Sequence, residues 1–141
     1  MVSGVRVQEY WVSNILGLAV YKGNYEIIEY LLDNLEKPDL EYGAKLIKQD
    51  GKDKKITNLY IGLTPLMLVF QTDEEVNKLE ITKLLLKHGA NLQSKSQGGN
   101  QFIFWSAFYG HIPITEYLLQ NHKIDFEHRN GIRVCNPNKT P

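Results

Sequence analysis

Three segments of this sequence align with one another, and this internal repetition restricts the fold more than any other feature. Residues 14–32 and 101–119 align without a gap: each has glycine at its tenth position, isoleucine four residues later and Glu-Tyr-Leu-Leu at its end. The middle segment, residues 64–71 continuing at 81–92, has the same pattern with four additional residues between its halves. Such repetition predicts small units that bury their apolar faces against neighbouring units in a stack.

Each segment has the pattern of two short helices joined by a turn. Thr64 followed by Pro65 is a helix start signal, because the hydroxyl can cap the helix and proline costs nothing in its first turn. Gly23 and Gly110 are placed to end the first helix of their units in a left-handed conformation. The apolar residues recur at helical spacing; in the first helices they are Leu16, Leu18, Ala19, Leu66, Leu68, Val69, Ile103, Trp105 and Ala107, and in the second Ile27, Ile28, Leu31, Leu32, Ile81, Leu84, Leu85, Ile114, Leu118 and Leu119.

The middle segment resembles an ankyrin repeat. The resemblance rests on Thr64-Pro-Leu, on Leu84-Leu-Leu-Lys-His-Gly-Ala-Asn-Leu92 and on Tyr109-Gly-His111, which is similar to that family's inter-helix turn. It covers residues 14–34 and 62–130, and it implies an all-α solenoid of helix-turn-helix units joined by β-hairpin loops. The sequence departs from the family at Asn14-Ile15 and Gln101-Phe102, which replace Thr-Pro. It also departs at three positions that usually hold histidine, Gly17, Met67 and Phe104, and these changes should weaken the bonding of hairpin to helix.

Two segments do not fit the repeat. Asn14 and Thr64 are 50 residues apart, whereas the family period is about 33 residues. Within the excess, residues 45–49 and 54–60 flank Asp50-Gly51 and predict an elongated hairpin, with a disordered loop as the alternative. Residues 136–141 end in Thr-Pro, which fits either the opening of another repeat or a polar tail.

The expected organisation therefore has six parts. They are a lead-in (1–13), repeat 1 (14–34), an inserted finger or loop (35–61), repeat 2 (62–95), repeat 3 (96–130), and a tail or truncated fourth repeat (131–141).

The sequence shows no arrangement of residues that would carry out catalysis or hold a cofactor. It lacks a phosphate-binding loop, a dinucleotide fingerprint, a zinc-protease motif and paired cysteines. The four histidines, His88, His111, His122 and His128, lack the further ligands of a metal site, and Cys135 has no neighbouring base. We therefore expect no enzyme activity, no cofactor and no metal.

Charge and cysteine content also restrict the class of protein. Lysine plus arginine and aspartate plus glutamate number 16 each, so we expect no nucleic-acid binding. The sequence has no apolar run long enough to cross a bilayer, so we expect no membrane insertion. A single cysteine does not require an oxidising compartment, which favours an intracellular, cytoplasmic protein. Residues 45–55 hold five lysines and two aspartates, which fits a solvated hairpin tip or a patch for phosphate or an acidic partner.

The resemblance implies a protein-binding module that uses hairpin tips and the exposed ends of the first helices. On this sequence the corresponding partner-binding residues are Tyr21, Lys22, Tyr60, Leu63, Gln71, Gln97, Asn100, Phe108 and Tyr109. Aromatic residues are enriched among interface hot spots, so we expect Tyr21, Phe108 and Tyr109 to line a concave surface. The alternative is that these rings pack on adjacent repeats of the same chain.

Two other functions remain open at this point. The chain could be the targeting or regulatory segment of a larger enzyme or channel, or part of a longer ankyrin array. It could also be a structural subunit that docks into a large complex through residues 35–61.

Overall fold

The structure, a computed structural model, describes residues 7–50, 53–72 and 77–124. Within these ranges it describes only the backbone of residues 7, 48–50 and 53–60, and both backbone and side chains of all the others. The predictions for Gly51, His128, Cys135 and residues 136–141 lie outside the described residues, as does the side chain of Tyr60.

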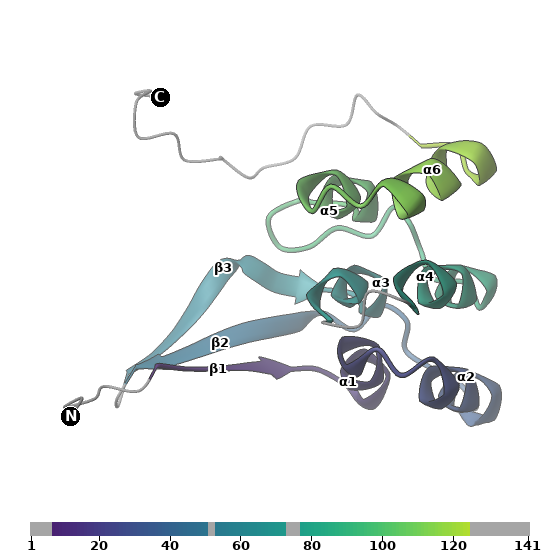
Figure 1. The fold of residues 1–141 in the computed structure, drawn as a ribbon. Coiled ribbons are helices and arrows are strands. Elements are labelled where there is room, and N and C mark those ends of the chain that lie inside the picture. Colours follow the sequence, from purple (N-terminus) through teal and green to yellow (C-terminus); the bar gives the residue numbers. More distant parts are fainter. Residues whose placement is uncertain (1–6, 51–52, 73–76, 125–141) are drawn as a thin grey trace, which may run out of the picture.

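The described residues form three helix pairs that stack in chain order (Figure 1). Helix α1 (Ile15–Lys22) pairs with α2 (Tyr25–Asn34), and α5 (Phe102–Phe108) pairs with α6 (Ile112–Asn121). Between them, α3 (Pro65–Leu68) continues as the 3-10 helix η1 (Val69–Gln71) and pairs with α4 (Lys78–Lys87). Helices α1, α3 and α5, here called the inner helices, form one column, and α2, α4 and α6 form the other (Figure 1). The predicted helix-turn-helix stack is therefore present.

Polar residues at the helix starts explain where these short helices begin. The Asn14 side-chain oxygen accepts a hydrogen bond from the Gly17 N–H at 2.8 Å, and the Thr64 hydroxyl accepts one from Met67 at 3.4 Å. Asparagine thus replaces threonine in repeat 1 without loss of the cap. Gly23 and Gly110 have φ angles of 71° and 65°, as the sequence predicts for the ends of their helices.

A three-stranded antiparallel sheet projects from the inner-helix column (Figure 1). Its strands are β1 (Val7–Val12), β2 (Ala44–Asp50) and β3 (Asp53–Leu63), in that order. Strand β1 pairs with β2 from Val7 opposite Asp50 to Val12 opposite Lys45. The fold is therefore helical with a small sheet rather than all-α, and β1 lies within the predicted lead-in of residues 1–13.

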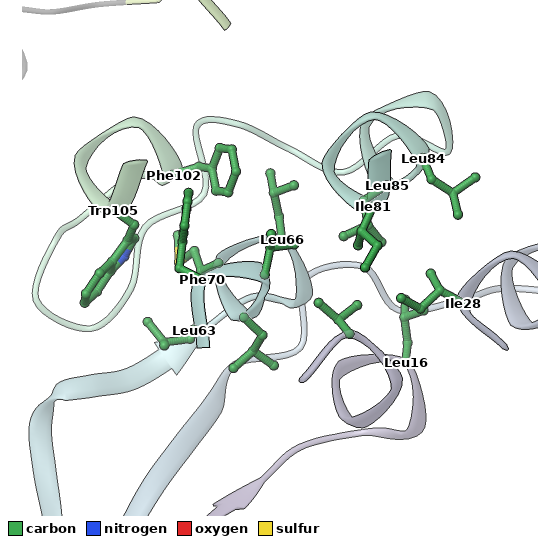
Figure 2. Packing of buried hydrophobic residues seen from close by; sticks show 14 of the residues in the cluster. Leu16, Ile28, Leu63, Leu66, Phe70, Ile81, Leu84, Leu85, Phe102 and Trp105 are labelled. Atoms are coloured by element: carbon green, nitrogen blue, oxygen red, sulfur yellow. The ribbon is translucent and has the colours of Figure 1, made fainter. Parts of the chain in front are cut away.

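The hydrophobic core continues through all three repeats. Leu16 and Ile28 of repeat 1 face Ile81 of repeat 2, while Leu66 and Phe70 of repeat 2 face Phe102 of repeat 3 (Figure 2). Burying a side chain of this size contributes roughly 1.5–3 kcal/mol to stability. Neighbouring repeats therefore hold one another in place, which single pairs of short helices could not achieve alone.

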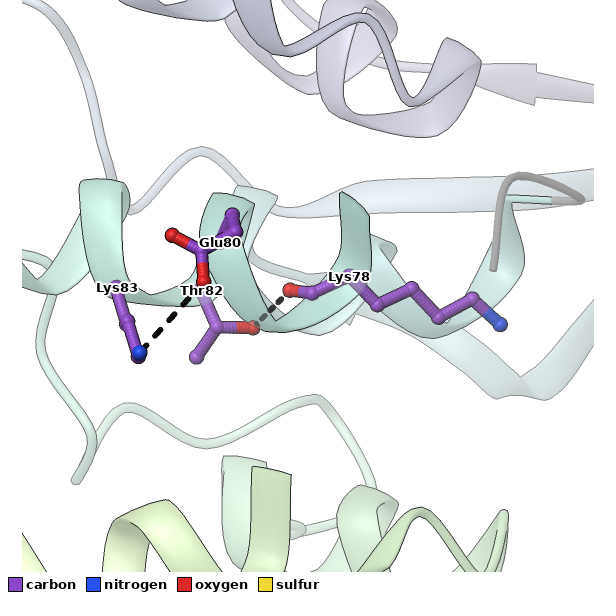
Figure 3. Close-up of polar contacts among 4 residues, drawn as sticks. All are labelled: Lys78, Glu80, Thr82 and Lys83. Atoms are coloured by element: carbon purple, nitrogen blue, oxygen red, sulfur yellow. Dashed lines mark hydrogen bonds and ion pairs between the residues drawn. The ribbon is translucent and has the colours of Figure 1, made fainter. Parts of the chain in front are cut away.

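A buried threonine within α4 has its hydrogen-bonding group satisfied inside its own helix. The Thr82 hydroxyl donates to the Lys78 carbonyl oxygen at 2.8 Å, one turn earlier (Figure 3). On the same helix, the Lys83 ammonium lies 3.6 Å from the Glu80 carboxylate, and both of these side chains are largely exposed (Figure 3). Thr82 can therefore stay buried at no polar cost, while exposed pairs such as Glu80 with Lys83 contribute little to stability.

Candidate partner-binding surface

Five of the predicted partner-binding residues lie at the C-terminal ends of the first helices of the three repeats. We call Tyr21, Lys22, Gln71, Phe108 and Tyr109 the inner-helix row. Alignment of the repeats places Tyr21, Gln71 and Phe108 at equivalent positions. The Gln71 side-chain amide donates a hydrogen bond to the Tyr109 hydroxyl at 2.6 Å, which connects repeat 2 to repeat 3. The row is therefore continuous at least from repeat 2 to repeat 3.

Phe108 and Tyr109 form the exposed aromatic part of this row. Phe108 is 48% exposed and Tyr109 is 39% exposed, and their ring centroids lie 5.1 Å apart at a steep angle. The Tyr109 ring also stacks on Phe70 at 5.6 Å, and Phe108 meets the edge of Trp105 at 5.7 Å. Buried rings therefore support the two exposed rings from below, so little side-chain freedom remains to be lost on binding.

Tyr21 lies where the helices meet the sheet. Its ring is half-buried and lies 6.1 Å from the ring of Trp11, on β1. Lys22 is exposed, and its ammonium lies 5.8 Å from the centroid of the Tyr21 ring. Trp11 is not among the residues predicted from the sequence, because the sequence predicts no strand in residues 1–13.

Two of the predicted contact residues are buried and cannot touch a partner in this conformation. Leu63 is fully buried because β3 ends in the core, directly before the capping residue Thr64. Asn100 is also fully buried: its backbone carbonyl accepts a hydrogen bond from the Ser96 N–H at 2.9 Å, which closes the turn before α5. The prediction that Leu63 and Asn100 are exposed for direct contact with a partner is therefore wrong.

Gln97 is the remaining predicted tip residue, and it is exposed. Its backbone N–H donates to the carbonyl oxygen of Ile61 at 2.9 Å, which ties the turn before repeat 3 to β3. The hairpin side of the surface is thus held in place by backbone bonding between repeats.

The histidines in the described residues lie at helix ends and at a contact between repeats. The His111 Nδ1 accepts a hydrogen bond from the Ile114 N–H at 3.2 Å and so caps α6. His88 lies 3.9 Å from the Asp33 carboxylate, which connects repeat 2 to repeat 1. Within residues 7–50, 53–72 and 77–124, no group of three histidine, cysteine or acidic residues is placed to hold a metal ion.

No helix among the described residues is both long enough and apolar enough to span a bilayer.

One tyrosine has a perturbed ionisation. The pKa of Tyr25, at the start of α2, is raised above its ordinary value of 10.0. Desolvation is the largest cause, followed by the negative charges of Glu29 and Glu80. Because Glu80 belongs to repeat 2, a smaller part of the shift comes from the contact between repeats 1 and 2.

Comparison with known proteins identifies the family. A sequence profile of ankyrin repeats matches residues 16–130 as three copies, so the chain belongs to the ankyrin repeat family. An ankyrin repeat protein of Acanthamoeba polyphaga mimivirus is 31% identical over 82 residues, which cover 57% of this chain and 10% of that protein. The chain therefore matches only a small part of this relative. Ankyrin repeats are generally protein-binding modules without catalytic activity, which agrees with the class inferred from the sequence.

Proposed function

We propose that this chain is a non-catalytic module that binds another protein through its inner-helix row, with Gln97 and Tyr60 as further contacts from the turns and the sheet. The observation that carries the proposal is the pair of exposed rings, Phe108 and Tyr109, at the end of α5. Exposed aromatic rings that rest on a packed base match the composition of interface hot spots.

The chemistry of the row indicates what kind of partner surface it would accept. Phe108 and Tyr109 offer apolar area, the Tyr109 hydroxyl and Gln71 offer polar groups, and Lys22 offers one positive charge. A partner would place apolar side chains over the rings of repeat 3 and an acceptor or acidic group near Lys22. Binding would then rest on surface complementarity, without turnover.

Site-specific photo-crosslinking tests which face meets the partner. A benzoylphenylalanine would replace Phe108 in one variant and Tyr42 in another, and each would be irradiated in lysate of the source cells. Tyr42 is the matched control because it is an exposed aromatic residue in the loop between α2 and β2 and does not belong to the inner-helix row. We expect a defined protein adduct from position 108 that Tyr109→Ala in the same variant removes. Equal adducts from both positions, or none from position 108, would contradict the proposal.

A further inference from the structure

The alignment of the repeats shows which positions face the preceding repeat. In repeats 2 and 3, residues at these positions pack against the preceding repeat. Phe102 of repeat 3 stacks on Phe70 of repeat 2 at 5.1 Å, and Ile81 of repeat 2 faces Leu16 and Ile28 of repeat 1 (Figure 2). We call this set the leading face. Its members are Ile15, Leu18, Ile27 and Tyr30 in repeat 1, Pro65, Leu68, Ile81 and Leu84 in repeat 2, and Phe102, Trp105, Ile114 and Tyr117 in repeat 3.

Burial separates repeat 1 from the others. The leading residues Leu68, Ile81, Leu84, Phe102, Trp105 and Ile114 are all at most 6% exposed. In repeat 1, the four equivalent residues are apolar or aromatic but lie between 48% and 65% exposed. Repeat 1 therefore has the side chains of an interface whose second half is not provided by the described residues of this chain.

Repeat 3 shows the complementary situation on the face that would receive a following repeat, here called the trailing face. Val20 and Leu32 of repeat 1 are buried under repeat 2, but their equivalents in repeat 3, Ala107 and Leu119, are exposed. Tyr25 is partly buried against the core, whereas its equivalent Ile112 is 72% exposed.

We infer that this chain associates head to tail with a second copy of itself, the leading face of repeat 1 stacking on the trailing face of repeat 3. By alignment, the two faces are equivalent to the two halves of an interface that the chain already makes twice, between repeats 1 and 2 and between repeats 2 and 3. Each copy carries both halves of the contact, and both are uncovered in the described structure. Because the two halves differ, the contact is heterologous, and its repetition adds copies in a row instead of closing a dimer.

The test uses one substitution on each face of the full chain. Leu18→Glu places a negative charge on the leading face, and Leu119→Glu places one on the trailing face, so the two altered faces repel each other. Both residues are about half exposed, at 51%, so the fold should tolerate the changes. Tyr42→Glu is the control, because Tyr42 is exposed but belongs to neither face. The readout is the weight-average mass by sedimentation equilibrium across a range of protein concentrations, with circular dichroism to verify folding.

Head-to-tail association predicts a specific pattern of masses. The wild type and Tyr42→Glu should rise steadily in mass with concentration, while each face variant alone should stay at the 16.2 kDa of one chain. An equimolar mixture of the two face variants retains one intact leading face and one intact trailing face, so it should give a complex of two chains and no more. A wild type that stays monomeric would overturn the inference. So would two variants that do not associate on mixing. A face variant that still associates by itself would also overturn it, because that result indicates a face that pairs with the same face of another copy.

Discussion

Gly62 illustrates how one residue without a side chain positions two repeats. It has a φ angle of 76°, and a Cβ atom placed there would lie 3.0 Å from the backbone nitrogen of Gln97. That nitrogen donates the hydrogen bond to Ile61 that ties the turn before repeat 3 to β3. Gly62 therefore satisfies a backbone requirement and a packing requirement at once.

Gly62→Ala should be more destabilising than Gly110→Ala. Gly110 also has a left-handed φ, but a Cβ there would meet nothing within 4 Å, so its substitution costs only the backbone strain of roughly 1–2 kcal/mol. At Gly62 the clash with the backbone adds to the same strain. Urea denaturation of the two variants measures the difference in the free energy of unfolding, and equal losses would show that the close approach at Gly62 has no cost.

Tyr25 predicts a dependence of stability on alkaline pH. Its pKa is higher in the folded chain than its ordinary value of 10.0, so the folded state keeps the phenol proton where the unfolded state has lost it. The resulting stabilisation is complete below pH 10 and is lost as the pH rises through and beyond that value. Tyr25→Phe should therefore lose stability less steeply than the wild type above pH 10. Parallel curves for the two proteins in chemical denaturation would contradict this assignment.

At the scale of elements, the helix pairs could be predicted from the sequence and β1 could not. Thr64-Pro65, Gly23 and Gly110 mark helix boundaries through local chemistry, which a single sequence displays directly. Strand β1 depends on pairing with β2, more than thirty residues later in the chain. Its Val-Gln-Glu-Tyr-Trp-Val sequence has high β propensity, and this was the available signal.

The candidate site shows the same division. The positions at the ends of α1 and α5 follow from the repeat alignment, and Phe108 and Tyr109 are exposed there. Leu63 and Asn100 lie at turn positions by alignment, but their burial depends on how the turn packs against neighbouring repeats. Local sequence does not contain that information.

Trp11→Ala should loosen β1 from the inner-helix column. The ring is partly buried against the core and contacts Tyr21, so its loss should cost about 2–3 kcal/mol, less than a fully buried aromatic residue. Hydrogen exchange should rise in the amides of β1 and of its partner β2 while those of α6 stay protected. Uniform exchange across all elements would show instead that the sheet and helices unfold together.

At the scale of the whole molecule, repeat 2 couples the other two. Phe70 is the clearest link, since its ring stacks on Phe102 and Tyr109 and lies 6.0 Å from His111. Phe70→Ala should cost about 3–5 kcal/mol, a large part of the stability of a small domain. Phe70→Leu retains most of the buried volume and should cost much less. In hydrogen exchange, the alanine variant should expose α5 and α6 before α1 and α2, and equal exposure of all helices would show that the repeats are not separable.

The affinity of a Phe108→Ala, Tyr109→Ala double variant tests most directly whether the exposed rings of repeat 3 bind a protein partner. The measurement is isothermal titration calorimetry with the protein captured by crosslinking at position 108, using Tyr42→Ala as the control for loss of an exposed aromatic ring. We predict binding at least tenfold weaker for the double variant, with folding intact by circular dichroism and the control unchanged. A folded double variant that binds as tightly as the wild type would contradict a role for these two rings in binding.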